Sequence, residues 1–291
     1  MMRARFPALT RSRALILATL GTVGAATALA AQEPSTLRTV EFSRQRQDST
    51  PLRVRVDYAA GKVVVHGTDQ PLLYQAAIAY DPRRSEPVYD FDAGSRVLKV
   101  GTRQAADDAP SGPPGELRLD LARDVPVSLQ LQTGASEADL DLGGMRLTRV
   151  VVESGATDAS LHFDAPNRQP MAQLELAVGA ASLQARGLAN ARASQMRVKV
   201  GVGSAELDFG GEWTNDVELE LDVALGKAAL RVPDDVGVRV ETSRVLGSFE
   251  REGFVKRGDA YYSANWDRAR HKLRVHSRMV LGELEITRGA S

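Results

Sequence analysis

The chain of 291 residues contains no cysteine. No disulfide can therefore hold its fold, and neither a zinc–thiolate site nor lipid attachment at an N-terminal cysteine is possible. Aromatic residues make up only 5% of the sequence, so a core has to be built from aliphatic side chains. The chain has 37 basic and 37 acidic residues and no net charge. Because nucleic-acid-binding domains need a basic face, we expect no nucleic-acid partner.

Recognisable catalytic motifs are also missing. The sequence contains no G-x-S-x-G, no H-E-x-x-H and no Walker loop. Gly201-Val-Gly203 lacks the third glycine of a dinucleotide-binding loop, and no helical pattern follows it. We therefore predict a protein that is not an enzyme and binds no cofactor, and we assign no catalytic, cofactor-binding or metal residue.

Histidine is as scarce as the catalytic motifs. The four histidines are His66, His162, His271 and His276. His271 and His276 are five residues apart, so on one strand they would face opposite sides. We interpret all four as surface residues rather than metal ligands.

The only long uncharged run lies at the N-terminus. Arg3, Arg5, Arg11 and Arg13 precede an uncharged stretch at 14–31 that contains Ala-Leu-Ala at 28–30. This pattern predicts a secretory signal peptide over 1–30, with an uncleaved membrane anchor as the alternative. The remaining chain has 33 basic against 37 acidic residues, a net charge of −4. We expect an exported protein, in the periplasm or on the cell surface, that contacts a membrane only through this segment if it is not cleaved.

Residues 129–240 contain a repeat in which apolar residues recur at offsets 0, 2, 11 and 13. Alternation with period two predicts two half-buried strands in each copy. A glycine between them, such as Gly134 or Gly226, predicts a turn with positive φ. The clean copies begin at Leu129, Val150, Met196 and Leu219. A copy at Leu174 fits if two residues are removed from its turn, and further copies are expected at Leu52, Val238 and Leu273.

The repeat length predicts the architecture. A period of about 20–24 residues with short strands is typical of stacked coils, so we predict an all-β solenoid of short stacked strands. The outward residues Glu175, Arg197, Glu220 and Arg239 alternate in sign from copy to copy. Stacking in register would make them favourable neighbours. An antiparallel β-sandwich built from the same strands as hairpins is the alternative.

The sequence divides into four parts. We predict a signal peptide at 1–30, a polar linker at 31–51, an N-terminal β region at 52–128 and the repeat domain at 129–291. Within the last part, 253–272 interrupts the repeat and contains Phe254, Tyr261, Tyr262 and Trp266. We interpret this insertion as a hairpin that packs on the end or side of the stack, because a chain with few aromatics uses them in its core first. The alternative is an aromatic contact surface for a partner or glycan.

Stacked copies would also align outward carboxylates. Facing carboxylates about 5–10 Å apart are what a glycosidase requires, and clustered oxygens bind calcium. We favour a solubilising acidic face, interrupted by His162 and Arg231. The carboxylates are those of Asp139, Asp141, Glu206, Asp208, Glu283 and Glu285.

Several C-terminal motifs resemble a known family. They run from Leu225-Gly-Lys to Val-Arg-Val240, then Gly247-Ser-Phe-Glu, Gly258-Asp-Ala-Tyr261 and Leu281-Gly-Glu-Leu-Glu-Ile286. They resemble the C-terminal domain of LiaF-type cell-envelope stress proteins, within the wider toast-rack or “putative adhesin” family. The resemblance covers 129–291 well and 52–128 loosely. It implies a right-handed, β-helix-like stack in an envelope or surface context, and it brings no catalytic motif.

Together these features predict a secreted or envelope-associated, non-enzymatic β-solenoid interaction module. Its partner would be an envelope protein or a glycan, and the sequence leaves the choice open. The first alternative is a periplasmic sensor-regulator that binds a protein partner. However, the chain lacks the several N-terminal membrane helices of the LiaF pattern, so membrane-bound regulation of a sensor kinase is not carried over. A carbohydrate-active β-helix enzyme is the remaining alternative.

Overall fold

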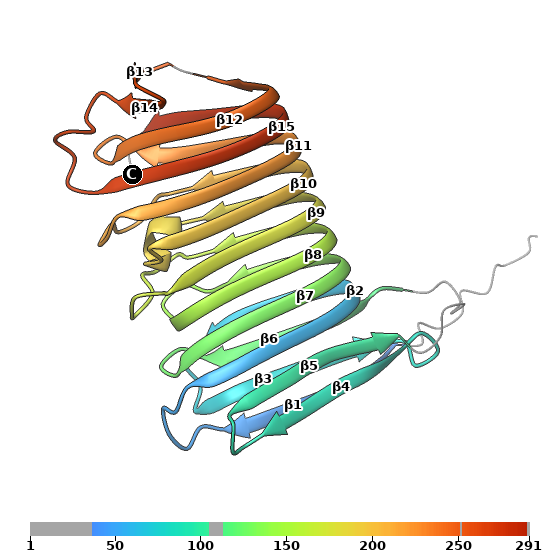
Figure 1. Cartoon of the computed structure of the whole chain (residues 1–291). Coiled ribbons are helices and arrows are strands. Elements are labelled where there is room, and N and C mark those ends of the chain that lie inside the picture. The colour runs from blue at the N-terminus through green and yellow to red at the C-terminus, as the bar shows by residue number, and fades with distance from the viewer. Residues whose placement is uncertain (1–36, 105–112, 251, 290–291) are drawn as a thin grey trace, which may run out of the picture. The chain divides into compact units, whose positions relative to one another are not determined.

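The computed structural model describes residues 37–104, 113–250 and 252–289 (Figure 1). The predicted signal peptide at 1–30 lies outside the described residues. No helix in the described ranges is long and apolar enough to cross a membrane. The described chain is almost entirely β-structure, with one 3₁₀ helix at Leu188–Ala191. The strands are β1 (Arg38–Gln45), β2 (Leu52–Thr68), β3 (Leu72–Tyr80), β4 (Ser85–Asp92), β5 (Val97–Gln104), β6 (Gly115–Ala122), β7 (Pro126–Asp141), β8 (Arg146–His162), β9 (Gln173–Arg186), β10 (Gln195–Asp208), β11 (Val217–Pro233), β12 (Gly237–Phe249), β13 (Phe254–Arg257), β14 (Ala260–Ser263) and β15 (Lys272–Gly289).

Eight long strands form a parallel stack. They pair in the order β2, β7, β8, β9, β10, β11, β15 and β12. Figure 1 shows that each strand bends back on itself, so its first and second legs lie in two facing layers. Parallel neighbours cannot be hairpin partners, because a parallel pair needs a crossover connection. The predicted β-solenoid is therefore confirmed, and the antiparallel sandwich is wrong.

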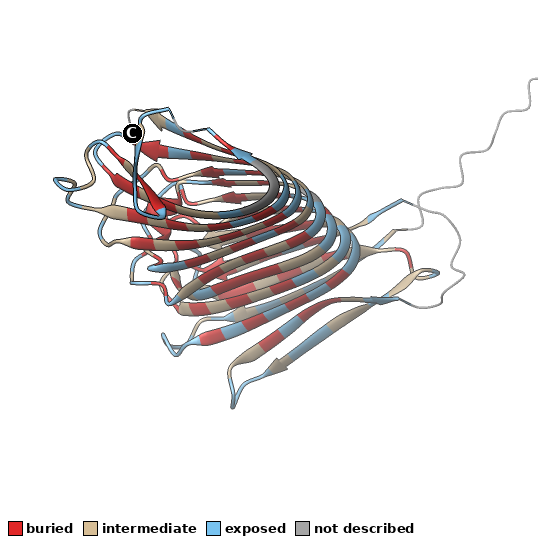
Figure 2. Cartoon of the chain, turned by 45° about the horizontal axis from the view of Figure 1, so that its top comes forward, coloured by how far each residue is buried: buried red, intermediate tan, exposed pale blue. Residues whose placement is uncertain are grey.

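The core lies between the two legs of the stacked strands. Along β7, for example, Leu129, Leu131 and Leu140 are buried while Gln132 and Glu137 are exposed. The same alternation runs through the other strands as bands of buried and exposed residues (Figure 2). Burying one such aliphatic side chain contributes about 1.5–3 kcal/mol, so the alternation supplies most of the stabilisation that a cysteine-free chain needs.

The strand register agrees with the repeat in the middle of the stack and differs at its ends. Leu129 is paired with Val150, as predicted. However, Val54 rather than Leu52 pairs with Leu129, and Val275 rather than Leu273 pairs with Leu219. The removal of two residues from the copy at Leu174 is not needed. Leu174 pairs with Val150 and Leu183 with Ala159, so both strands have the same spacing. The errors have a simple reason: a slip of two residues keeps the same side chains on the core side.

The glycines at the bends play two different steric roles. Gly226 has a φ of 142°, and a Cβ there would lie 1.7 Å from the carbonyl oxygen of Gly203. The predicted positive φ is therefore correct at Gly226. It is wrong at Gly134 and Gly155, which do not have positive φ. A Cβ at Gly155 would instead meet the carbonyl oxygen of Gly134 at 3.0 Å, so these glycines are required by close approach of the neighbouring strand.

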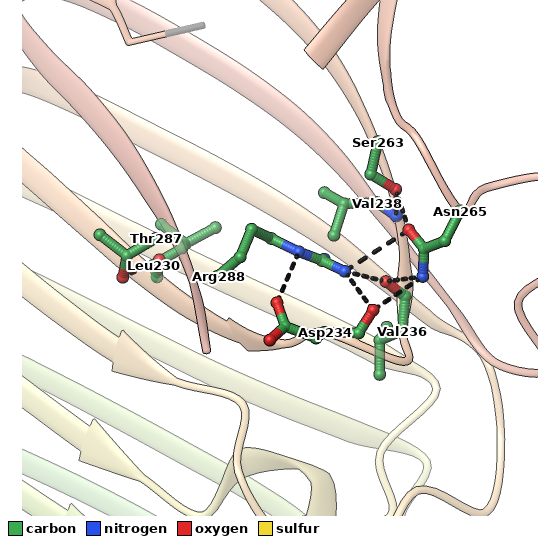
Figure 3. A network of polar contacts seen from close by, with 8 residues as sticks. All are labelled: Leu230, Asp234, Val236, Val238, Ser263, Asn265, Thr287 and Arg288. Atoms are coloured by element: carbon green, nitrogen blue, oxygen red, sulfur yellow. Dashed lines mark hydrogen bonds and ion pairs between the residues drawn. The ribbon is translucent and has the colours of Figure 1, made fainter. Parts of the chain in front are cut away.

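The last two copies do not follow chain order. β15 lies between β11 and β12, whereas the repeat predicted β12 directly after β11. Arg288 at the end of β15 donates through Nη2 to the carbonyl oxygens of Asp234 (2.9 Å) and Val236 (2.7 Å). Asn265 donates to the same two carbonyls from another segment (Figure 3). This network connects the C-terminal strand to the corner between β11 and β12. Burial lowers the pKa of Arg288.

The N-terminal end of the stack is closed by five shorter strands, which pair parallel with β2 and antiparallel with one another. The first leg of β2 pairs with β5, which pairs with β4. Its second leg pairs with β6, which continues to β3 and β1. Phe42 of β1 stacks on Tyr89 of β4 with ring centroids 4.0 Å apart, so the two layers meet. The prediction of a polar linker at 31–51 is thus wrong for Arg38–Gln45, which forms β1.

The aromatic insertion forms a hairpin at the other end. β13 and β14 pair antiparallel, and β14 pairs with Arg239–Glu241 of β12. Tyr261 is buried, with its ring centroid 5.3 Å from that of Phe249. The hairpin therefore packs on the end of the stack, which was the favoured interpretation of the insertion.

Candidate binding surface

Four large aliphatic side chains are exposed together at the bends of three neighbouring strands. Val202, Leu225 and Leu281 are successive partners across β10, β11 and β15. They are 51%, 43% and 45% exposed, and Val280 beside Leu281 is 55% exposed. We call Val202, Leu225, Val280 and Leu281 the bend ridge. Soluble chains seldom expose contiguous large aliphatic groups without a functional reason.

The bend ridge is confined to the C-terminal half of the stack. At the same register position, β7, β8 and β9 carry the small residues Ala135, Ala156 and Ala180. Two shallow grooves also follow the bends and share Lys199. The groove over β7–β9, about 480 Å³, is lined partly by Gln132, Thr133, Glu153 and Ser154. The groove over β10, β11 and β15, about 400 Å³, is lined partly by Val200, Val223, Ala224, Met279 and Val280.

Charged side chains cover the first leg beside the bend ridge. Arg197 donates from Nε to Glu220 at 2.6 Å, and this bond holds the pKa of Glu220 below its ordinary value. Arg278 donates to both carboxylate oxygens of Asp222 at 2.7 and 2.8 Å, which raises the pKa of Arg278. The ridge thus has charges of both signs on its border.

The predicted alternation of charge holds only partly. Arg197 lies between Glu175 and Glu220, as expected. Glu220 does not lie beside Arg239, because β15 separates β11 from β12 and places His276 next to Glu220. The insertion of a strand out of chain order changed the neighbours that a simple repeat predicted.

His276 bridges two strands within a cleft of about 710 Å³. Its Nδ1 lies 2.8 Å from Glu241 Oε2, and its Nε2 lies 3.4 Å from Glu218 Oε1. His271 is elsewhere, with its ring centroid 6.5 Å from that of Trp213. Within the described ranges, no group of three or more histidine, aspartate or glutamate side chains is arranged to hold a metal.

The predicted ladder of carboxylates does not assemble into a catalytic pair. Ser160 and Gln184 separate Asp139 from Glu206 in the register, a distance of about 14 Å at ordinary strand spacing. His162 and Arg186 likewise stand between Asp141 and Asp208. Lys227 Nζ lies 3.8 Å from Glu283 and 2.6 Å from Glu285. The geometry therefore fits the solubilising face and not a pair of facing catalytic carboxylates.

The aromatic residues of the insertion do not form an open platform. Tyr262 and Trp266 contact each other edge to face at 5.5 Å. Lys272 and Arg274 lie over the Trp266 ring at 5.3 and 5.8 Å, while Arg239 and Arg257 lie over Tyr262. Cations thus occupy the ring faces that a sugar would stack against.

Comparison with known proteins identifies the family. Residues 32–184 match the model for the N-terminal domain of toast_rack, DUF2154. The chain therefore belongs to the toast-rack family, as the resemblance predicted. This match includes 52–128, which the resemblance covered only loosely. Among curated proteins, none matches the chain.

Three solved structures are similar to this chain over most of its length. A “putative cell adhesion protein” from Clostridium sporogenes is 14% identical, with a TM-score of 0.41, over 87% of this chain and 100% of that one. A “putative adhesin” from Parabacteroides distasonis is 12% identical, with a TM-score of 0.36, over 87% and 98%. A “putative lipid binding protein” from the same species is 8% identical, with a TM-score of 0.40, over 87% and 97%. Similarity at this level says nothing about what the present chain binds.

Proposed function

We propose that this toast-rack protein is an exported, envelope-associated module that acts without catalysis and binds a protein partner at the bend ridge. The observation that carries the proposal is the exposure of Val202, Leu225, Val280 and Leu281 side by side on three strands. Exposed aliphatic side chains contribute no hydrophobic stabilisation, and burying them against a partner would provide it. The predicted signal peptide supports export.

A protein partner fits this surface better than a glycan does. An apolar centre with a charged border is the usual composition of a protein–protein interface. Here the border contains the Arg278–Asp222 pair on one side and the Lys227–Glu285 pair on the other. The aromatic rings on which a sugar could stack are those of Tyr262 and Trp266, and cations lie over both rings.

The test is capture of envelope proteins by the full chain and by a ridge variant. Leu225→Ser/Val280→Ser removes two side chains that are 43% and 55% exposed, so the fold should persist. Val255→Ser is the matched control, because Val255 is 56% exposed but lies on β13, outside the ridge. We expect the same enriched proteins with the wild type and the control, and at least a tenfold loss with the ridge variant.

Two outcomes would overturn the proposal. One is an enriched protein set that is unchanged by Leu225→Ser/Val280→Ser. The other is capture of an envelope polysaccharide, with no protein, by both wild type and variant. That result would favour a glycan as the partner. If the captured protein is a membrane sensor, the role becomes that of the predicted sensor-regulator, still acting through the ridge.

A further inference from the structure

The C-terminal end of the stack has an uncovered backbone edge. Along the outer edge of β12, β14 covers only Arg239–Glu241. In the described part of the chain, no strand pairs with the outer edge of 242–249, although its inner edge pairs with β15. A free strand edge presents a row of unpaired N–H and C=O groups, which is a template for an additional strand.

The opposite end of the stack is protected against such pairing. Its outermost strands are β1 and β4. β1 carries Arg38, Glu41 and Arg44, and β4 contains Pro87. Charges and proline are the usual means by which proteins block edge pairing. The segment 242–249 contains no proline, and Arg244 is its only charged residue.

The core is also less complete at this end. An inward row of aliphatic residues that includes Val198 and Leu221 continues as Ser277 on β15 and Thr242 on β12. Ser277 is 2% exposed, and its Oγ has no hydrogen-bond partner. Thr242 Oγ1 is also buried without a partner. A strand added to β12 would lie about 4.8 Å from Thr242, in reach of this unsatisfied hydroxyl.

We propose that two copies of this chain associate end to end by antiparallel pairing of β12 with β12. When 242–249 is paired along its whole length with its own copy, Thr242 lies opposite Phe249 and Ser243 lies opposite Ser248. The side-chain faces agree in this register. Phe249 is buried and Thr242 buries its hydroxyl on the core side, whereas Ser243 and Ser248 are both exposed.

The structure also determines how far this association extends. An isologous contact about a two-fold axis uses the same surface on both copies and closes as a dimer. The charges of β1 and Pro87 of β4 disfavour further pairing at the N-terminal end, so we expect no filament growth from that end. In the dimer, the centre of the β12 contact falls at the bend, where Leu246 is the register neighbour of ridge residue Leu281. The bend ridges of the two copies would therefore meet at the axis.

The test is the mass of the full chain in solution, measured by sedimentation equilibrium over a hundredfold range of concentration. We expect about twice the chain mass of 31.4 kDa for the wild type. Ser243→Lys/Ser248→Lys places lysine opposite lysine in both halves of the contact and should give the monomer. Ser243→Lys/Ser248→Glu places lysine opposite glutamate and should restore the dimer. Gln132→Lys/Thr214→Lys adds the same charge at exposed positions away from β12 and should remain dimeric.

Three results would overturn the proposal. They are a wild type that stays monomeric throughout, a mass that rises beyond two copies, and a dimer that is unchanged by Ser243→Lys/Ser248→Lys. Thermal unfolding of each variant excludes loss of fold as the cause of a monomer, and the lysine–glutamate variant provides a second check. This proposal does not depend on the bend ridge as a partner site: ridge substitutions change capture, whereas β12 substitutions change mass.

Discussion

The two halves of the stack make the same bend with different residues. In β7–β9 the bend contains Gly-Ala, as at Gly155-Ala156, whereas in β11 and β15 it contains Leu-Gly, as at Leu225-Gly226. β10 combines both in Gly201-Val202-Gly203. In each half, a glycine lies where a Cβ would meet the carbonyl oxygen of the preceding strand. The bend glycine therefore lies two residues later in β11 and β15 than in β7–β9.

This difference explains where the candidate binding surface lies. When glycine occupies the later position, the residue before it can carry a large side chain, and the bend turns that side chain toward solvent. β7–β9 have only alanines at this position, while β11 and β15 expose Leu225 and Leu281. The later glycine allows a large residue before it without requiring one, because β2 has Gly61 at the later position and Ala60 before it.

The largest effect is expected when a carboxylate is placed on the buried side of β10 and, in a second variant, on its exposed side. Leu207 is 1% exposed, whereas Val202 on the same strand is 51% exposed. Leu207→Asp should lower the free energy of unfolding by about 4 kcal/mol or more, because it buries an unpaired carboxylate. Val202→Asp should change it by less than about 0.5 kcal/mol. Urea unfolding of both variants measures the difference, and equal midpoints would show that the assigned faces of β10 are incorrect.

Alanine at the bend glycines distinguishes the two halves directly. Gly226→Ala combines a φ of 142° with a Cβ 1.7 Å from a carbonyl oxygen, so we expect a loss of about 3 kcal/mol. Gly155→Ala has ordinary φ and a contact of 3.0 Å, so a loss of about 1 kcal/mol is expected. Urea unfolding again provides the measurement. A larger effect at Gly155 than at Gly226 would contradict the two steric roles.

Arg288 tests how the out-of-order strand is held in the second half. Arg288→Met removes the hydrogen bonds to the carbonyl oxygens of Asp234 and Val236, which should cost about 2 kcal/mol. Hydrogen exchange should show the lost protection in β15 and β12 and not in β7. Arg231→Met, at an exposed position on β11, is the control and should leave the exchange pattern unchanged.

The smallest effect concerns the charged leg beside the bend ridge. The Arg197 guanidinium lowers the folded-state pKa of Glu220, so the ionised pair stabilises the folded state above the ordinary glutamate pKa. This contribution is lost as the pH falls through the folded-state pKa. Glu220→Gln should therefore lower the unfolding midpoint slightly at pH 7 and by less as the pH falls below the ordinary glutamate pKa. Both side chains are about 40% exposed, so the shift is small. Glu212→Gln, at an exposed position, is the control for the loss of a carboxylate.

Much of the fold could be predicted from particular residues. Leu129, Leu131 and Leu140 indicated which side of a strand faces the core, and their burial confirms it. Glycine in the bend was recognised at Gly134 and Gly226, although the steric reason at Gly134 depends on a carbonyl of the adjacent strand. The bend ridge was missed because Val202 and Leu225 continue the inward alternation of their strands, two residues after the buried Val200 and Val223, although the bend exposes them. A large aliphatic residue directly before a glycine was the signal that could have revealed the ridge.

By itself, the sequence determined the all-β repeat, the inward and outward faces and the family, because these depend on local alternation and on turn residues. Tertiary structure alone decided the neighbours. It placed β15 between β11 and β12, moved the register of the outer copies by two residues and closed only one end of the stack. The physical reason is that period-two alternation is unchanged by a two-residue slip or by an exchange of similar strands. Contacts such as the Arg288 network, between residues distant in sequence, select one arrangement.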